Sequence, residues 1–252
     1  MDKAREIYDK LIWESKNRFE GGLLDYTIVN LSYASNKLEG STMTLDQTWF
    51  LYNYDSIIPN NEDEYTPTKV NDIVEMKNHF LLFKEMLKTI YEPLSDSLIK
   101  RYHKILKTGT NDEVLGYNIG EYKKLKNVAG NMDTSFPKDV EKDMLGLLSS
   151  YQKKESVHIE DIADFHAKYE KIHPFQDGNG RTGRIIMFKE CLKNGIVPFI
   201  IDAGTKNTYV NVMNLYRENG NKAFIRYLER QQAEYLEEAE YFISESTDES
   251  GL

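Results

Sequence analysis

The sequence predicts an all-α protein with one small β-hairpin. Apolar residues recur at helical spacing along most of the 252 residues, and strands do not alternate with helices. One Gly- and Asn-rich stretch, 109–135, lacks helical spacing and carries the turn residues of an irregular loop with a hairpin. The length and a 40% share of hydrophobic residues allow a sizeable core, in one large domain or two small ones.

Four helices are expected in the N-terminal third of the chain. The first has apolar residues at helical spacing from its start, and the second, at about 24–40, ends at a glycine, the residue type favoured after a helix. Thr44 and Gln47 form the pattern of a capping box, which starts a short third helix. Thr66 and Pro67 fit the first positions of a long fourth helix.

The rest of the chain predicts further helices on both sides of the irregular stretch. Apolar spacing and start or stop residues place them from Ser95, from Pro137, over 159–172, from Arg181 to just before Gly195, and over about 205–218 and 221–243. No internal repeat is present. The fold class is therefore a helical bundle rather than an α/β sheet protein.

The charge balance argues against large polyanionic partners. The net charge is −9, which disfavours nucleic acid and anionic membranes. Seven acidic and no basic residues lie in 231–252, so that 1–230 carries only −2 and can still bind one small polyanion. The single cysteine, Cys191, excludes an intrachain disulfide and a cysteine-based zinc site. The charged N-terminus and the lack of a long apolar run lead us to expect a cytoplasmic protein.

The stretch 173–184 carries the chemistry of an anion site. It joins a histidine, a carboxylate, glycines and two arginines immediately before a helix, whose free N–H groups and dipole favour negative charge. Arg181 and Arg184 lie about one turn apart and suit bidentate contact with phosphate. Asp177 can hold Mg²⁺ through one oxygen, and His173 can accept a proton from a hydroxyl. The alternative, a capped helix with ordinary surface arginines, explains each residue singly but not their joint occurrence.

Written out, these residues read HPFQDGNGRTGR. They resemble the HxFx[D/E]GNGRxxR signature of the Fic family and match every specified position, and the preceding helix with His166 is similar to that family's as well. The resemblance implies the Fic fold, a helical bundle with a β-hairpin flap. It divides the chain into an N-terminal helical region at 1–92, a Fic catalytic core at 93–235 and an acidic C-terminal tail at 236–252. It also implies an enzyme that transfers AMP from ATP to a protein hydroxyl.

The resemblance assigns a role to each residue of the signature. His173 would be the general base, Asp177 would ligate Mg²⁺ between two phosphates, and Arg184 would bind the γ-phosphate. Phe175 would be a core anchor. The remaining nucleotide-binding positions would be Gly178, Asn179, Gly180 and Arg181 at the phosphates and Asn207 and Tyr209 near adenine.

A second motif resembles the family's internal brake. Residues 35–40 are similar to the inhibitory pattern [S/T]xxxE[G/N], and Ser35 and Glu39 share a helix face because they are four residues apart. The resemblance implies that Glu39 pairs with Arg184 and prevents ATP from binding productively. The alternative is that Glu39 is a solvated residue at a helix end.

The hairpin expected at 122–130 corresponds to the flap with which the family holds its target. There the target would add a strand, which reads backbone rather than sequence. The chain has Lys123 and Lys124 where many family members carry an arginine. A plain surface hairpin remains the alternative. The flap residues implied to bind the target are Lys126, Asn127, Val128 and Ala129.

The expected function is therefore an autoinhibited protein adenylyltransferase that modifies a Ser, Thr or Tyr hydroxyl and releases pyrophosphate. Its expected partners are ATP, Mg²⁺ and a protein target, with auto-modification, a homodimer and removal of AMP left open. Two alternatives stay open: a non-catalytic nucleotide-binding regulatory or toxin–antitoxin-type module, and transfer of another phosphate-containing group. His79, His103 and Cys191 are expected to be structural.

Overall fold

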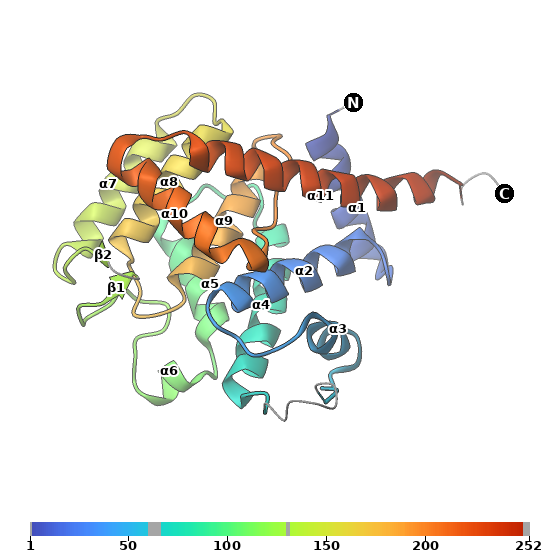
Figure 1. The fold of residues 1–252 in the computed structure, drawn as a ribbon, viewed down its shortest axis with the longest axis horizontal. Coiled ribbons are helices and arrows are strands. Elements are labelled where there is room, and N and C mark those ends of the chain that lie inside the picture. The colour runs from blue at the N-terminus through green and yellow to red at the C-terminus, as the bar shows by residue number, and fades with distance from the viewer. Residues whose placement is uncertain (1, 60–66, 130–131, 249–252) are drawn as a thin grey trace.

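The computed structural model describes residues 2–59, 67–129 and 132–248 (Figure 1). Within them the fold is almost entirely helical, which confirms the predicted all-α class. The α-helices are α1 (Lys3–Asn17), α2 (Leu23–Leu38), α3 (Leu45–Tyr54), α4 (Val70–Lys88), α5 (Asp96–Lys107), α6 (Asn111–Val114), α7 (Val140–Gln152), α8 (Ile159–Ile172), α9 (Asn179–Lys193), α10 (Lys206–Asn219) and α11 (Ala223–Asp248), with a 3₁₀ turn, η1, at Ala203–Thr205.

Helix α9 lies in the middle of the bundle (Figure 1). Every residue from Asn179 to Leu192 is buried, and α9 packs against α1, α2, α4, α5 and α8. The helix is nevertheless not apolar, so its buried charges need partners. Near its end, Lys189 donates to the Glu92 carbonyl across 2.8 Å and to Glu190 across 2.7 Å. Its first turns carry the charges of the sequence motif.

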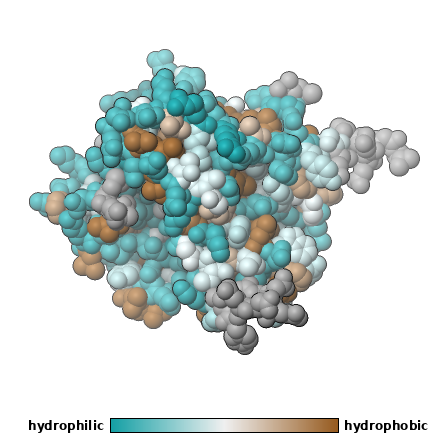
Figure 2. All heavy atoms as spheres, viewed as in Figure 1, coloured by the Kyte–Doolittle hydropathy of each residue, from teal (hydrophilic) through white to brown (hydrophobic). Residues whose placement is uncertain are grey.

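The N-terminal helices share a core with the rest of the bundle. The main hydrophobic cluster joins side chains from α1 to α5 with others from α7 to α9 and α11. A second cluster joins α8 and α9 to α10 and α11, and it includes Leu38 at the end of α2. Helix α2 therefore ends at the seam between the two clusters, close to where α9 begins. The surface seen in Figure 2 is mostly hydrophilic with scattered hydrophobic spots.

The predicted starts of two N-terminal helices have different outcomes. The capping box that starts α3 is confirmed, with the Thr44 and Gln47 side chains each accepting from the other's backbone N–H. The expected start of the next helix at Thr66 and Pro67 is wrong, since α4 begins at Val70; Thr66 itself lies outside the described residues. The segment before α4 packs on α3 instead, where Gln47 donates to the Thr68 hydroxyl across 3.1 Å.

Within the described residues, extended structure is limited to one very short pairing of strands. Strands β1 (Val128–Ala129) and β2 (Met132–Asp133) are antiparallel, with Val128 opposite Asp133. Most of the flap expected at 122–130 forms no strand, and Gly130 lies outside the described residues. The reason is visible at Lys123, whose backbone N–H donates to the Pro174 carbonyl across 2.8 Å instead of to a neighbouring strand. No helix within the described residues is long and apolar enough to cross a membrane.

Candidate functional site

The turn between α8 and α9 is held rigid by its own side chains. His173 ends α8 in the left-handed region, with φ 51°, and Gly178 starts α9 with φ 78°. Asn179 closes the turn because its amide accepts from the Phe175 N–H and donates to the Phe175 carbonyl, both across 2.8 Å. The Asn179 side chain is therefore used inside the turn. The backbone N–H groups at the start of α9 stay available for an anion.

Helix α5 packs against this turn through His103. His103 stacks on the buried ring of Phe175, with ring centroids 3.8 Å apart. The Gly120 N–H donates to His103 Nδ1, so that Nε2 carries the proton and donates to the Asp177 carbonyl across 2.9 Å. Burial lowers the pKa of His103 to about 3 and keeps the ring neutral. His103 and Phe175 are thus structural, as the sequence predicts.

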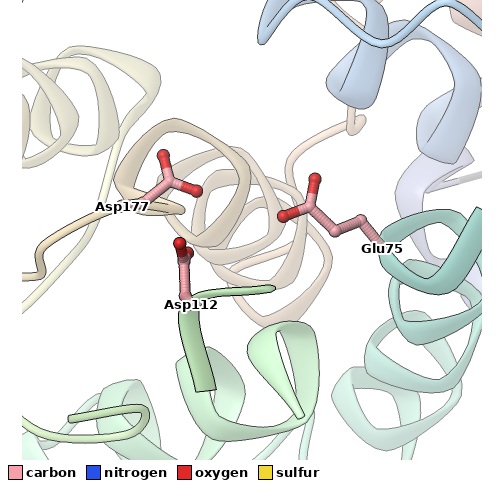
Figure 3. Close-up of side chains that lie close together, drawn as sticks. All are labelled: Glu75, Asp112 and Asp177. Atoms are coloured by element: carbon pink, nitrogen blue, oxygen red, sulfur yellow. The ribbon is translucent and has the colours of Figure 1, made fainter. Parts of the chain in front are cut away.

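Asp177 lies in a network of charged side chains (Figure 3). Its Oδ2 accepts from Arg181 across 2.9 Å and from Lys107 across 2.6 Å. The Lys107 ammonium also pairs with Glu75 and with Asp112, so that it lies among three carboxylates from α4, α6 and the turn before α9. Burial alone would raise the pKa of Asp177, but Arg181 and Lys107 hold it well below its ordinary value. The carboxylate is therefore ionised and fixed in place.

Arg181 is bound by two neighbouring helices and by the turn before α9. Its guanidinium pairs with Glu75 of α4 and with Asp177, and it donates to the Asn36 side chain of α2 across 3.2 Å. Only 2% of Arg181 is exposed. Arg181 consequently joins α2 and α4 to the turn, and its charge is compensated before any ligand binds.

Arg184 lies one turn further along α9 and binds the end of α2. Its Nε donates to the Ser35 hydroxyl and its Nη2 to the Ser35 carbonyl, both across 2.9 Å, and Nη2 also donates to Glu39 Oε1 across 2.6 Å. Burial would lower the pKa of Arg184, but Glu39 and other groups hold it above its ordinary value. The Glu39 carboxylate also lies against Gly180, where a Cβ would meet Oε1 at 2.2 Å.

A cavity of about 560 Å³ opens beside this ion pair. Its size is in the range of small-molecule sites. The wall comes from the end of α2, the end of α8, the start of α9 and one face of α10, and the sequence-predicted residues in it are Glu39, His173, Gly180, Arg184, Asn207 and Tyr209. Asp177, Gly178, Asn179 and Arg181 do not line this cavity. A second cavity of about 580 Å³ between α7 and α8 contains none of the predicted residues.

The rear of the cavity holds a buried acid beside a histidine. Glu170, three residues before His173 on α8, is 8% exposed, and its Oε2 lies 3.5 Å from His173 Nδ1. His166, one turn earlier, pairs through Nε2 with the Tyr209 hydroxyl. Burial lowers the pKa of His166 to about 4, so this ring is neutral at pH 7.

The segment expected to form the flap is anchored to the same turn. Asn127 donates to the Phe175 carbonyl across 2.8 Å, and the Lys123 ammonium donates to Asn127, to Thr134 and to the Ile172 carbonyl. Burial lowers the pKa of Lys123 to about 8. Further out, Lys126 pairs with Asp133 across the hairpin and Val128 is 61% exposed, while of Ala129 only the strand is described.

Sequence reasoning missed the residues that support the motif from other helices. Glu75, Lys107 and Asn36 hold Asp177 and Arg181, and Glu170 adjoins His173. Two of them leave a detectable signal: Glu170 precedes His173 by one helical turn, and Lys107 follows His103 by four residues on the same face. Glu75 and Asn36 lie far from the motif in sequence and leave none.

Comparison with known proteins agrees with this geometry. Residues 93–191 match the model of the Fic/DOC family, and the match spans α5, the turn and nearly all of α9. Residues 93–191 form a Fic/DOC domain. The predicted family resemblance is thereby confirmed for the part of the chain that carries the motif.

Two proteins that are similar to this chain are named for an activity. A protein adenylyltransferase Fic from Nematostella vectensis is 28% identical over 203 residues, which cover 79% of this chain and 45% of that protein. The protein adenylyltransferase fic-1 from Caenorhabditis briggsae is 25% identical over 201 residues, 78% of this chain and 38% of that protein. The matched part is less than half the length of either relative.

Solved structures share the fold. A Fic-domain-containing signaling protein from Bacteroides thetaiotaomicron superposes with a TM-score of 0.71 at 21% identity, covering 96% of each chain. A fragment of Fic-1 from C. elegans superposes with the same TM-score at 19% identity, covering 95% of this chain and 71% of that one. The helices outside the matched domain therefore also follow the arrangement seen in Fic-domain proteins.

Proposed function

We propose that this chain is a protein adenylyltransferase that transfers AMP from ATP to a Ser, Thr or Tyr hydroxyl and is inhibited at rest by Glu39. The observation that carries the proposal is the meeting of His173, the start of α9 and Arg184 at one cavity. A base, an anion-binding helix end and a phosphate-binding arginine are the parts that nucleotidyl transfer needs. The names of the relatives support the same activity.

In this mechanism the target hydroxyl oxygen attacks the α-phosphorus of ATP. A bond forms between that oxygen and phosphorus, the bond from phosphorus to the bridging oxygen of the β-phosphate breaks, and pyrophosphate leaves. The hydroxyl proton passes to His173. The protein's contribution is positioning and charge neutralisation, because phosphorus chemistry of this kind needs little else.

The phosphates would lie over the start of α9. Its free N–H groups and the guanidinium of Arg184 supply positive charge there. Gly180 has no Cβ, so its backbone can be approached closely, as Glu39 does at rest. Arg181 and Asn179 act from outside the cavity wall, by fixing the turn and through the backbone at Gly178 and Asn179.

Asp177 fits a magnesium ligand. Its Oδ2 is taken by Lys107 and Arg181, and half of its side chain is exposed, so that one carboxylate oxygen remains for a cation shared with phosphates. Bound there, Mg²⁺ would neutralise phosphate charge. Glu75, Asp112 and Asp177 could together suit a cation, but they already surround the Lys107 ammonium. The positive charge of Lys107 therefore compensates these carboxylates.

The inhibition would follow from a competition for Arg184. In the resting protein Glu39 occupies the guanidinium and adds a negative charge beside Gly180, where the γ-phosphate would bind. A charge-assisted contact in a partly buried site is worth about 1.5–3 kcal/mol. ATP would therefore bind weakly or in an unreactive pose until the end of α2 moves away.

The adenine site and the target-protein site are proposed on opposite sides of His173. Asn207 and Tyr209 lie in the α10 wall, suited to an adenine ring. Lys126, Asn127, Val128 and Ala129 offer an edge to which an extended target segment could add. Auto-modification and a homodimer belong to the same proposal. We also keep the division at 1–92, 93–235 and 236–252 as a proposal, with α11 running through the last boundary.

A second candidate is a nucleotide-binding regulatory module without catalysis. It is favoured by one observation, namely that Arg184 already donates twice to Ser35 and once to Glu39. In that case nucleotide binding would move α2 without any transfer. The two candidates differ in whether freeing Arg184 produces a covalent product.

The test compares the wild type with Glu39→Gly, using ATP labelled at the α- or γ-phosphate and a cell lysate as target. The proposal expects protein labelling only by Glu39→Gly and only from the α-label; labelling from the γ-label would indicate phosphate transfer. Lys37→Gly is a matched control, since it loosens the same helix end without contacting Arg184. If Glu39→Gly binds ATP but labels nothing, the regulatory module is correct and the enzyme is not.

A further inference from the structure

Within the described residues, two carboxylates line the cavity, Glu39 and Glu170, and only Glu170 is buried. It lies outside the sequence signature, on the last turn of α8, and the proposed chemistry does not use it. A buried carboxylate is costly unless it has compensating partners. Its neighbours should therefore indicate what it does.

The surroundings of Glu170 favour its charged form. Burial alone would raise the pKa of Glu170, but His173, His166 and Arg184 lower it to about 2. The carboxylate is therefore negative at any pH at which the protein would work. A fixed negative charge beside a proposed general base has a direct consequence for that base.

His173 presents a complementary need. Its Nδ1 is buried and has no hydrogen-bond partner in the part of the chain that the structure describes. The nearest acidic atom is Glu170 Oε2 at 3.5 Å, longer than a formed hydrogen bond, and the second Glu170 oxygen, Oε1, is also buried without a partner. Buried donors and acceptors are normally paired. Catalytic hydrogen bonds are often long before substrate binds, and a small ring rotation would form this one.

We propose that Glu170 is a positioning residue for His173: its carboxylate holds the proton on Nδ1, leaves Nε2 as the proton acceptor and stabilises the imidazolium that forms. This rests on the proposed function. When the target hydroxyl gives its proton to Nε2, the ring becomes positive and the interaction with Glu170 strengthens. The contact is thus worth more in the transition state than at rest, which is the requirement for raising kcat.

The backbone explains why α8 can bring these two side chains together. His173 adopts a left-handed conformation while its N–H still donates to the Tyr169 carbonyl across 2.8 Å. The ring is thereby the last group of α8, one turn after Glu170. The side chain of His173 is 17% exposed, so one edge of the ring faces Glu170 while the ring still lines the cavity.

Other charged groups face the same pair and set the sign of the effect. Arg217 has two buried guanidinium nitrogens without hydrogen-bond partners, and the carboxylates of Glu170 and Glu218 favour its charged form against burial. If the Glu170 charge is removed, the positive charges of Arg184 and Arg217 remain, and they disfavour a positive His173. The titratable and charged groups around this pair are His166 and Tyr169 on α8, Arg184 on α9, Lys206, Tyr209, Arg217 and Glu218 on α10, and Glu39 at the end of α2.

The first experiment measures kinetics in the Glu39→Gly background. Glu170→Gln keeps the size and an acceptor oxygen but removes the charge. We expect kcat to fall about tenfold or more, KM for ATP to stay within about twofold, and the acid limb of the pH–rate profile to move to lower pH by about one unit. Glu170→Asp retains the charge and should restore the acid limb. Equal losses in Glu170→Gln and Glu170→Asp, or a change in KM alone, would overturn the proposal.

The second experiment does not depend on activity. Nitrogen NMR of the imidazoles, with His173 assigned from the signals lost in His173→Asn, reports the tautomer and titration midpoint of His173. If Glu170 holds the proton, the His173 ring should be protonated on Nδ1 when Glu170 is present. Its titration midpoint should be lower in Glu170→Gln. An unchanged tautomer and midpoint would contradict it. If Glu39→Gly is inactive while these signals still shift, the proposed function fails and the positioning role stands.

A matched control separates this role from the loss of any buried carboxylate. Glu190 on α9 is 2% exposed, binds Tyr151 and Lys189, and lies outside the cavity wall. Glu190→Gln should lower thermal stability but leave the acid limb and the His173 signals unchanged. If Glu190→Gln moves both readouts as Glu170→Gln does, the effect is general and the positioning role is wrong.

Discussion

Nη2 of Arg184 donates to Oε1 of Glu39 across 2.6 Å, and this contact joins the first turns of α9 to the end of α2. The same guanidinium donates twice to Ser35, so one residue of the central helix fixes three acceptors at the end of a neighbouring helix. A ligand that binds Arg184 must therefore displace the end of α2, or bind only when α2 has moved away.

Ser35→Ala should weaken the hold of α2 on Arg184 without releasing it. The variant removes the hydroxyl that accepts from Nε but keeps Glu39 and the Ser35 carbonyl. We expect the free energy of unfolding to fall by about 1–3 kcal/mol, and AMP transfer to rise but remain below that of Glu39→Gly. Denaturant unfolding and labelled ATP measure the two effects. Transfer equal to that of Glu39→Gly would mean that the hydroxyl, not the carboxylate, is the main restraint.

Gly180→Ala should abolish transfer even when Glu39 has been replaced. An added Cβ would lie 2.2 Å from Glu39 Oε1 and 2.8 Å from Arg184 Nη1, so it fills the space proposed for phosphate. We expect ATP affinity in the Glu39→Gly background to drop at least tenfold, as calorimetry can measure. Gly146→Ala is the control, since nothing lies within 4 Å of its added Cβ. Full activity of Gly180→Ala would remove the start of α9 from the phosphate site.

Lys107→Met should destabilise the fold far more than loss of a surface lysine. It leaves Glu75, Asp112 and Asp177 without the ammonium at their centre. Breaking a buried pair in this way costs about 3–5 kcal/mol. The control is Lys77→Met, whose exposed pair with Asp55 should be worth less than about 1 kcal/mol. Similar unfolding free energies for the two variants would show that the charge network contributes little.

Stability should fall steeply between pH 7 and pH 5. Burial lowers the pKa of His79 to about 3, of His103 to about 3 and of His166 to about 4 in the folded protein. The unfolded chain takes up protons near pH 6.5, so it binds more of them in this window, and the free energy of unfolding decreases as the pH falls. The upper limit is about 1.4 kcal/mol per pH unit for each ring.

Urea unfolding at several pH values checks this expectation. Asp and Glu side chains titrate mostly below this window in the unfolded chain, so the histidines dominate it. A flat stability between pH 7 and pH 5 would show that the buried rings are not held neutral.

Much of the fold and half of the site could be predicted from sequence because the signal is local. Helical spacing, the capping box at Thr44 and the glycine turn before α9 each depend on residues a few positions apart. The twelve-residue motif likewise places His173, Gly180 and Arg184 near one another, because a single turn joins His173 to the helix that carries the other two. The match of residues 93–191 to the Fic/DOC family reflects that local pattern.

The remainder depends on contacts between distant helices. Asn36 and Glu75 meet Arg181 only because α2 and α4 pack on α9, and no spacing rule joins positions so far apart. The sequence also suggested a start for α4 that is too early, since Gln47 of α3 holds Thr68 in a non-helical segment. Asn179 looked like a phosphate ligand but closes its own turn. Tertiary contacts decided the first two cases, whereas the contacts of Asn179 are local to its turn.

In the proposed mechanism His173 accepts the hydroxyl proton during AMP transfer, and Glu39 prevents this transfer at rest. The most direct measurement is protein labelling from α-labelled ATP by Glu39→Gly and by the double variant Glu39→Gly/His173→Ala, with ATP binding by both confirmed. We expect strong labelling by the single variant and a loss of at least a hundredfold in the double variant. Equal labelling by the two, or none by Glu39→Gly, would contradict this mechanism.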